Sequence, residues 1–474
     1  MEEFETIVGL EVHVELKTES KIFCSCPTTF GAAPNTHICE VCAGLPGALP
    51  RLNKKVPEYA VMTGLALHAE ITKQMRFDRK NYFYPDLPKG YQISQLYAPC
   101  ARNGYLEIDD PEKKIRIHEL HMEDDAGKLI HDDTGTYIDF SRCGVPLIEI
   151  VTEPDFRSAE EVVSFLQKLK TMLQFLGVSD CKMQEGSMRV DVNLSVRKIG
   201  QETLGTRTEM KNLSSFRAVS KAVAYEARRQ WEALGRGEKI LRETRRWDEK
   251  NEISVSMRKK EDAAEYKYFP EPDLPVLCFS EEEIRAIKET LPELPEEKRR
   301  RYIEELHLPA YDAGILTSQR QVADLFEKTM EICHDPKEAS NWIMGEFMKI
   351  RNDHGDDEED FTMREESLGE IILLQKAGRI SRASAKALLL AAYEENALPK
   401  EYAEAHDLWL ITDKAVLLPV VEQVIKDNPK SVSEYRAGKV KNKQFLLGQA
   451  MRATKGKADP SILEGVLQEC LESE

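Results

Sequence analysis

Two patterns of hydrophobic and polar positions divide the chain. Over roughly the first 270 residues, several stretches alternate apolar and polar side chains with a period of two, which is typical of β-strands. These stretches are residues 7–16, 115–123, 147–151, 188–196 and 206–211. Two stretches with helical spacing, 159–176 and 216–234, lie between them. From about residue 280 the apolar residues recur at helical spacing, with charged outer faces. Those stretches are residues 281–305, 322–333, 339–351, 366–376 and 383–395. The pattern predicts an α+β body, a helical middle part and a helical tail.

Proline positions indicate where these parts separate. Pro270, Pro272 and Pro275 fall within six residues, which disfavours regular structure and predicts a boundary there. A second break is expected near residues 398–408, after Pro399. The remaining segment, from about residue 405 to the end, is then a small separate helical module.

Composition excludes several classes of protein. Of the 474 residues, 41% are hydrophobic and 31% are charged, so the chain can bury a core and is not compositionally disordered. No apolar run approaches the ~18–20 residues that a membrane span needs. The first five residues, Met-Glu-Glu-Phe-Glu, are acidic where a signal or transit peptide is basic. We therefore expect a cytoplasmic protein.

Four of the ten cysteines form two close pairs. Cys24 and Cys26 are separated by one residue, and Cys39 and Cys42 by two, with twelve residues between the pairs. Thiolates at this spacing can face one ion, and two such pairs complete a tetrahedron around zinc. Four ordinary reduced thiols are the alternative, and a redox C-x-x-C is less favoured because no strand-to-helix pattern follows it. We interpret the four as a structural zinc site, because four thiolates leave no position for a substrate.

Acidic and histidine side chains share one face of several predicted strands. In residues 8–16, Glu11, His13 and Glu15 alternate with Val12, Val14 and Leu16, so the two sets project from opposite faces. Similar polar positions recur at Glu119, His121, Glu123, Glu149, Asp191, Asn193 and Glu209, and Asp124 directly follows one of these stretches. A solvent-facing polar stripe is the alternative for any one strand. Because the pattern recurs, we predict an oxygen-rich site for a hard cation such as Mg²⁺.

Residues 78–92 interleave basic and aromatic side chains, as phosphate contact and base stacking require. Composition leaves this interpretation and that of a packed surface loop equally open. The chain contains no G-x₄-G-K-[ST] loop, no G-x-G-x-x-G fingerprint opening a helix and no G-x-S-x-G elbow. A nucleotide-binding site in this protein therefore uses neither of the two common glycine-rich loops.

The tail reverses the overall charge. The chain as a whole has a formal net charge of −17 at pH 7, which argues against a protein that coats nucleic acid. Between residues 430 and 457, however, eight Lys or Arg stand against the single acidic residue Glu434. A charge run is often a solvated helix face. Since Phe445, Leu446 and Met451 can pack inward, the neighbouring lysines are left to contact an RNA backbone, and we favour that interpretation.

These motifs resemble the B subunit of the tRNA-dependent amidotransferases, which convert misacylated Glu-tRNA(Gln) or Asp-tRNA(Asn) to the amide. The resemblance runs essentially end to end. It rests on residues 8–16 (VGLEVHVEL), 78–95, 120–128 (LHMEDDAGK), 146–151 (PLIEIV), 211–216 (KNLSSF) and 268–274 (YFPEPDL). It implies a cradle-shaped catalytic domain over residues 1–292, mainly antiparallel sheet with helices. It also implies an all-α domain over residues 293–404. A small all-α, YqeY-like tail domain over residues 405–474 would follow and contact tRNA.

The resemblance also implies an activity and partners. ATP would phosphorylate the aminoacyl side-chain carboxylate, and ammonia freed from glutamine by a partner amidase (A) subunit would then displace phosphate. A small clasp (C) subunit would hold the two larger subunits together. Some members of the family lack the four cysteines, which agrees with zinc as structural support.

Site residues follow from the motifs together with this resemblance. The candidate catalytic residues and Mg²⁺ ligands are Glu11, His13, Glu123, Asp124 and Glu149, with Asp191 as a further Mg²⁺ ligand. Candidates for phosphate or tRNA-terminus contacts are Arg79, Lys80, Tyr82 and Lys89. Candidates for holding the tRNA body are Lys439, Lys441, Lys443, Arg452 and Lys455. Two alternatives remain: a non-catalytic zinc-containing tRNA-binding scaffold, and a metal-dependent hydrolase, which would leave the basic tail unexplained.

Overall fold

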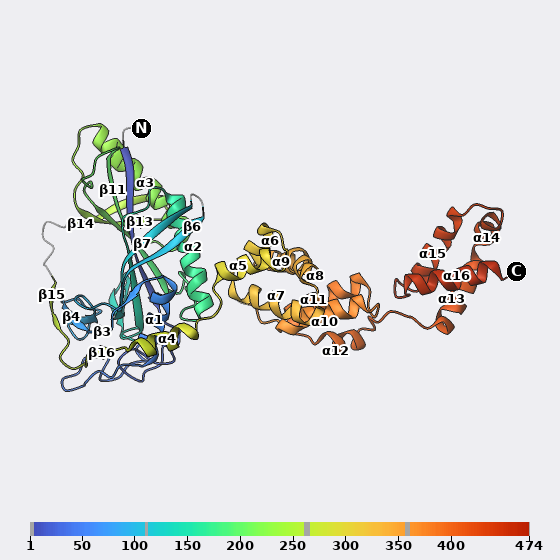
Figure 1. Ribbon diagram of the computed structural model, residues 1–474, viewed down its shortest axis with the longest axis horizontal. Helices are drawn as coiled ribbons and strands as arrows, with labels where there is room; N and C mark the ends of the chain where they lie inside the picture. The colour runs from blue at the N-terminus through green and yellow to red at the C-terminus, as the bar shows by residue number, and fades with distance from the viewer. Residues whose placement is uncertain (1–3, 110–111, 260–265, 356–360, 474) are drawn as a thin grey trace. The chain divides into compact units, whose positions relative to one another are not determined.

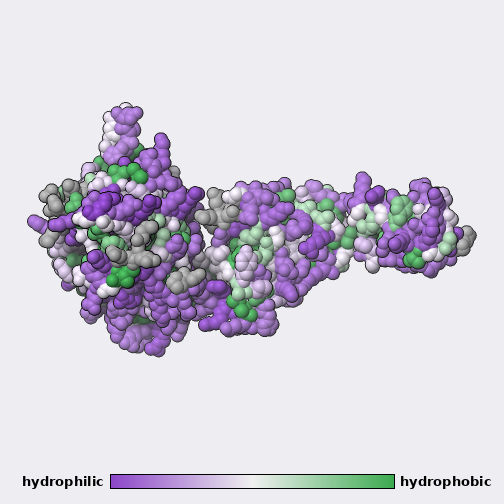
Figure 2. Space-filling model, turned by 90° about the horizontal axis from the view of Figure 1, so that it is seen from above, coloured by the Kyte–Doolittle hydropathy of each residue, from purple (hydrophilic) through white to green (hydrophobic). Residues whose placement is uncertain are grey.

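The computed structural model describes residues 4–109, 112–259, 266–355 and 361–473, and it divides into two compact units, residues 1–295 and 296–474. Figure 1 shows a sheet-containing first unit and an all-helical second unit. The α+β fold expected from the hydrophobic pattern is thereby confirmed. Figure 2 shows a mostly hydrophilic surface with small separate hydrophobic patches on the face drawn. Among the described residues, no helix has the length and apolar character to cross a membrane.

A nine-stranded sheet forms the body of the first unit. Its order is β14-β13-β12-β11-β1-β10-β7-β6-β2, and all neighbours are antiparallel except β12 and β13. The strands are β1 (Phe4–Glu15), β2 (Glu70–Ile71), β6 (Ala101–Asp109), β7 (Glu112–Asp124), β10 (Pro146–Thr152), β11 (Met188–Lys198), β12 (Thr208–Lys211), β13 (Glu243–Asp248) and β14 (Ile253–Lys259). The central strand β1 therefore has β11 on one side and β10 on the other.

Three smaller sheets flank the large one. β4 (Asp78–Asn81) lies between β15 (Lys267–Pro270) and β5 (Tyr91–Ser94) in a three-stranded sheet. β3 (Gln74–Met75) pairs with β16 (Leu277–Cys278), and β8 (Lys128–Asp132) forms a hairpin with β9 (Gly135–Asp139). Segments far apart in the sequence, near residues 80 and 268, are thus neighbours in space.

Helices cover the apolar face of the large sheet. They are α1 (Lys55–Ala66), α2 (Ala159–Leu176) and α3 (Phe216–Gly235), and α4 (Glu281–Glu289) packs against α1. The alternating apolar residues of β1, such as Val12 and Val14, are fully buried in one cluster with Phe165 and Leu166 of α2. α2 begins where the Ser158 side chain accepts a hydrogen bond from the Glu161 amide. Burying the even-numbered residues of β1 under helices directs the odd-numbered ones to the opposite face.

The second unit consists of helices around two separate apolar clusters. The first group is α5 (Pro295–Glu304), α6 (Ala310–Leu316), α7 (Arg320–Cys333), α8 (Pro336–Trp342), the π-helix η2 (Ile343–Phe347), α9 (Met348–His354), α10 (Glu365–Lys376), α11 (Arg382–Glu395) and α12 (Pro399–Ala405). The second is α13 (Lys414–Asp427), α14 (Pro429–Arg436), α15 (Lys441–Ala453) and α16 (Pro460–Glu472). Trp342 and Phe347 are buried in the first cluster, and Leu446 and Leu463 in the second.

Three expectations need correction. The helix expected over residues 281–305 is two helices, because Pro292 and Pro295 interrupt the hydrogen-bond ladder between α4 and α5. The stretch 339–351 contains a π-helix between two α-helices. The proline-rich stretch 270–275 is not a boundary, since β15 pairs with β4 and Leu274 is buried in the core of the first unit. The three-domain division at 292/293 and 404/405 stays a proposal, and the separate tail cluster supports its second break.

Candidate functional site

Three neighbouring strands place two histidines and a glutamate in one row. His13 of β1 lies opposite Glu149 of β10, which lies opposite His121 of β7. Directly opposed residues of antiparallel strands project from the same face, so these side chains meet. The Glu149 Oε2 atom is 3.4 Å from Nε2 of His13 and 3.0 Å from Nε2 of His121.

Glu123 closes this row into a cluster. It follows His121 by two residues on β7 and therefore shares its face. Its carboxylate oxygens are 3.7 Å from Nε2 of His13 and 3.8 Å from Nε2 of His121. Ligand atoms of His13, Glu123 and Glu149 lie within 4.8 Å of one another, the spacing of a possible metal site. We call His13, His121, Glu123 and Glu149 the catalytic cluster.

Charge complementarity holds the catalytic cluster together. Burial opposes protonation of His121, but the Glu149 and Glu123 carboxylates raise its pKa to about 10. The pKa of His13 is also raised, because the same two carboxylates outweigh its burial. Burial likewise opposes ionisation of Glu149, yet the two histidines hold its pKa well below the usual value. Two carboxylates and two imidazoles thus face each other, and an added cation would compete with protons on the imidazoles.

A second carboxylate group lies beside the catalytic cluster. Glu11 of β1 is opposite Asp191 of β11, and carboxylate oxygens of Glu11, Asp191 and Glu209 lie within 4.8 Å of one another. The Lys211 ammonium group is 2.5 Å from Asp191 and 3.1 Å from Glu209. Burial and the neighbouring Glu149 raise the pKa of Glu11, which accepts a 2.9 Å hydrogen bond from Asn193. Glu209, Lys211 and His121 were missing from our candidate residues, although each stands at an alternating polar position in the sequence.

Asp124 stands apart from the catalytic cluster. Successive residues of a strand project from opposite faces, so it points away from Glu123. Its side chain is buried, forms an ion pair with Lys89 and accepts a 2.8 Å hydrogen bond from the Ile93 amide. Burial raises its pKa in spite of the Lys89 ammonium group. This arrangement attaches β5 to the end of β7, and a role of Asp124 in catalysis or Mg²⁺ binding stays a prediction.

The four candidates for phosphate or tRNA-terminus contacts have different surroundings. Arg79 makes a two-pronged ion pair with Glu271, at 2.7 and 3.0 Å, and contacts Asp273 at 3.0 Å. The ammonium group of Lys89 is paired with Asp124. Lys80 and Tyr82 instead approach the ring of Tyr266, with the Lys80 ammonium 4.9 Å from its centre. Lys80 and Tyr82 therefore retain more capacity for a ligand than Arg79 and Lys89.

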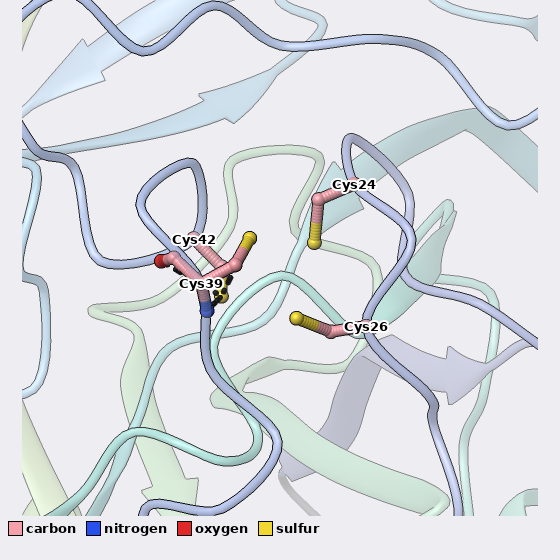
Figure 3. A group of neighbouring side chains, drawn as sticks. All are labelled: Cys24, Cys26, Cys39 and Cys42. Atoms are coloured by element: carbon pink, nitrogen blue, oxygen red, sulfur yellow. Dashed lines mark hydrogen bonds between the residues drawn. The ribbon is translucent and has the colours of Figure 1, made fainter.

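The four cysteines Cys24, Cys26, Cys39 and Cys42 converge (Figure 3). All four Sγ atoms lie within 4.8 Å of one another, and those of Cys39 and Cys42 are 3.9 Å apart. Tetrahedral zinc with Zn–S bonds of ~2.3 Å places its sulfurs ~3.8 Å apart, so the group fits this metal. A hydrogen bond from Cys24 lowers the pKa of the Cys42 thiol to about 4, despite burial.

A buried lysine supports the cysteine group. The Lys21 side chain is fully buried, and its ammonium group donates to the His37 carbonyl oxygen at 2.6 Å and to Cys42 Sγ at 3.6 Å. A positive charge at this position offsets part of the negative charge that four thiolates would bring.

The candidate basic residues of the tail lie on and around α15. Lys439, Lys441, Arg452 and Lys455 are exposed, and Lys443 is partly exposed. Lys443 forms an ion pair with Glu464 at 2.8 Å, and Lys439 one with Glu434 at 3.5 Å. Among the described residues, Lys441, Arg452 and Lys455 have no ion-pair partner. Lys441 and Arg452 are eleven residues apart, about three helical turns, so they share one face of α15.

Comparison with known proteins places this architecture in a family. Residues 6–285 match the GatB/GatE catalytic domain, and residues 324–471 match the GatB domain. The chain belongs to the GatB family. It is 52% identical over 475 residues to the B subunit of the aspartyl/glutamyl-tRNA(Asn/Gln) amidotransferase of Lachnoclostridium phytofermentans, covering 99% of both chains. It is 53% identical over 477 residues to the B subunit of the same name from Caldicellulosiruptor saccharolyticus, again covering 99% of both. The resemblance noted from the sequence motifs is confirmed.

The match to the GatB/GatE catalytic domain includes every strand that contributes to the catalytic cluster and the second carboxylate group. The match to the GatB domain includes α15 and the basic residues around it. The strands and helices that carry the candidate residues are therefore family architecture rather than peculiarities of this chain.

Proposed function

We propose that this GatB chain is the subunit of a glutamine-dependent amidotransferase that activates and amidates misacylated tRNA. Its substrates are Glu-tRNA(Gln), Asp-tRNA(Asn) or both, with ATP, and its products are Gln-tRNA(Gln) and Asn-tRNA(Asn). The observation that carries the proposal is the catalytic cluster, in which Glu123 and Glu149 lie between two histidines on one face of the large sheet. The names of its full-length relatives support the substrate class.

The reaction needs two steps because a carboxylate is a poor electrophile. An oxygen of the aminoacyl side-chain carboxylate attacks the γ-phosphorus of ATP, which forms an acyl phosphate and releases ADP. Ammonia then attacks the acyl carbon, loses a proton, and the C–O bond to phosphate breaks. The first step is a phosphoryl transfer, for which a protein supplies mainly positioning and charge neutralisation.

The residues present fit a magnesium ion at this site. Carboxylate oxygens are the ligands that Mg²⁺ prefers, and Glu11, Glu123 and Glu149 offer them from adjacent strands, with His13 and Asp191 as the further candidates. Bound there, Mg²⁺ would neutralise charge on the phosphate oxygens of ATP.

The protein's own groups assist the two steps. His13 and His121 orient the two central glutamates and hold Glu149 ionised. In its neutral form, His13 can accept the proton that ammonia loses. The Lys80 ammonium group can form a charge-assisted hydrogen bond with the phosphoryl group that is transferred.

Other parts of the chain take supporting roles in this proposal. The four cysteines hold a structural zinc ion, which braces residues 24–42. The basic residues of the tail hold the tRNA body. Ammonia is supplied by a partner amidase (A) subunit, with a small clasp (C) subunit completing a heterotrimer, and the assembly acts in the cytoplasm.

The experiment reconstitutes the chain with its proposed partners, glutamine, ATP and each misacylated tRNA. We expect Glu149→Gln to abolish amide formation while tRNA still binds, because the substitution removes the central charge between the two histidines. Glu107→Gln on β6 is the matched control, since Glu107 is an exposed carboxylate whose partner is the surface residue Lys114. Normal amidation by Glu149→Gln would refute the proposed site. Tight tRNA binding by the wild-type assembly without ATP-dependent amidation would favour a scaffold role.

A further inference from the structure

Three tyrosines, among them the tRNA-terminus candidate Tyr82, form a group near the catalytic cluster. They are Tyr82, which follows β4, and Tyr266 and Tyr268, which lie just before and within β15. The ring centres of Tyr82 and Tyr266 are 5.4 Å apart, and those of Tyr266 and Tyr268 are 6.4 Å apart, both at edge-to-face angles. We call these three residues the tyrosine cluster.

The register of the small sheet points this cluster toward the catalytic residues. Lys80 of β4 is opposite both Tyr268 of β15 and Gln92 of β5, so the three side chains project from one face. Gln92 donates a 2.9 Å hydrogen bond to the backbone oxygen of Asp124 at the end of β7. The face that carries Lys80 and Tyr268 is therefore the face that meets the strand of Glu123.

Lys80 links the tyrosine cluster to the catalytic cluster electrostatically. Its ammonium group lies 4.9 Å from the ring centre of Tyr266. Burial opposes its protonation, but the carboxylates of Glu123 and Glu149, together with Tyr268, raise its pKa. A cation held between aromatic rings and carboxylates can contact the phosphate of a nucleotide whose base stacks on the rings.

The tyrosine cluster is also accessible to solvent. Tyr266 is 47% exposed, and Tyr82 and Tyr268 are partly exposed. Burial raises the pKa of Tyr82 to about 12, so its phenol stays neutral and able to donate a hydrogen bond at physiological pH.

We propose that the tyrosine cluster, with Lys80, binds the adenine ring of a substrate and thereby orients its phosphate or ester end toward the catalytic cluster. This inference rests on the proposed function. Both substrates of that reaction carry adenine: ATP, and the 3′-terminal adenosine to which the amino acid of an aminoacyl-tRNA is esterified. Stacking on tyrosine recognises a planar base from either source, and the experiment separates the two.

The test compares Tyr266→Leu with Tyr266→Phe in the reconstituted amidotransferase. For each variant the KM for ATP and the KM for aminoacyl-tRNA are measured separately, together with kcat. Loss of a stacking partner is expected to raise one KM roughly ten- to a hundredfold, and Tyr266→Phe is expected to retain most of the wild-type value because it keeps the ring. A rise confined to the KM for ATP identifies the base of ATP, and a rise confined to that for tRNA identifies the terminal adenosine.

Controls make the outcome specific. Tyr311→Leu removes a tyrosine that is 73% exposed in the second unit, and both of its KM values are expected to stay unchanged. Tyr82→Leu should raise the same KM as Tyr266→Leu. Unchanged KM values in Tyr266→Leu and Tyr82→Leu, with normal kcat, would overturn the inference while leaving the proposed function intact. If the wild-type assembly forms no amide, the proposed function itself fails, and direct binding of ATP and of a CCA oligonucleotide to wild type and Tyr266→Leu then decides whether adenine binds here.

Discussion

Neutralising three basic residues of the tail should weaken tRNA binding by an amount that the structure lets us calculate. Lys441, Arg452 and Lys455 are exposed and have no ion-pair partner among the described residues, whereas Lys439 and Lys443 are paired with glutamates. A cation that neutralises a phosphate releases condensed counterions, so each contact contributes to the salt dependence of binding.

The expected magnitude follows from counting these contacts. Each neutralised phosphate changes the slope of log K against log[salt] by ~0.7 for a single strand to ~0.9 for a duplex. Replacing the three unpaired residues by Gln should therefore reduce the slope by about 2.1 to 2.7. Between 50 and 200 mM salt, the wild-type chain should then lose roughly 20- to 40-fold more affinity than the triple variant.

Binding of labelled tRNA to the full-length chain, measured at five or more salt concentrations, supplies both slopes. The double variant Lys439→Gln/Lys443→Gln is the matched control, and its slope should change by less per residue because Glu434 and Glu464 already offset these charges. A triple variant with the wild-type slope would refute the assignment of this face to RNA. A larger change in the double variant would show that the ion pairs open on binding.

Three further outcomes test other parts of the structure. Cys39→Ser should abolish binding of one zinc ion per chain, measured by metal analysis, and lower the thermal unfolding midpoint; a wild-type chain that is equally stable after chelation would contradict the zinc assignment. Lys21→Met should keep the fold but weaken zinc binding about ten- to a hundredfold in a competition assay with a chromogenic chelator, because Cys42 loses its buried counter-charge; equal affinity would count against that role. Glu327→Gln should destabilise the second unit at pH 7, where Lys298 and Arg301, despite burial, hold the pKa of Glu327 below its ordinary value. Since a lowered pKa contributes its full stability above the unfolded pKa of ~4.3, the difference in unfolding midpoint should shrink below that value, as the pH falls through the lower pKa of Glu327 in the folded chain; a constant difference would argue against the ion pairs.

The period-two patterns predicted much of the site because they report which face of a strand a side chain occupies. Glu11 and His13 alternate with Val12 and Val14, and the structure puts the apolar pair under α2 and leaves the polar pair on the other face. The same rule could have separated Asp124 from Glu123, since adjacent strand residues point in opposite directions.

Strand order was beyond the reach of these patterns. His13 lies opposite Glu149 although the two residues are more than 100 positions apart in the sequence. Glu149 lies opposite His121, which is 28 positions away. Local periodicity carries no information on such partners. The burial of Lys21 beside Cys42 is likewise a tertiary property, because nothing in the residues around a lysine tells whether its ammonium group faces water or a thiolate.

The most direct test of the proposed reaction follows the side-chain oxygens of the substrate. Misacylated tRNA is prepared with ¹⁸O in the side-chain carboxylate of its glutamate or aspartate, and the reconstituted assembly converts it to the amide with unlabelled ATP and glutamine. Because an acyl phosphate forms through a carboxylate oxygen and breaks at the acyl carbon, one ¹⁸O atom should appear in the released phosphate for each amide formed. Amide formation with unlabelled phosphate would contradict the account.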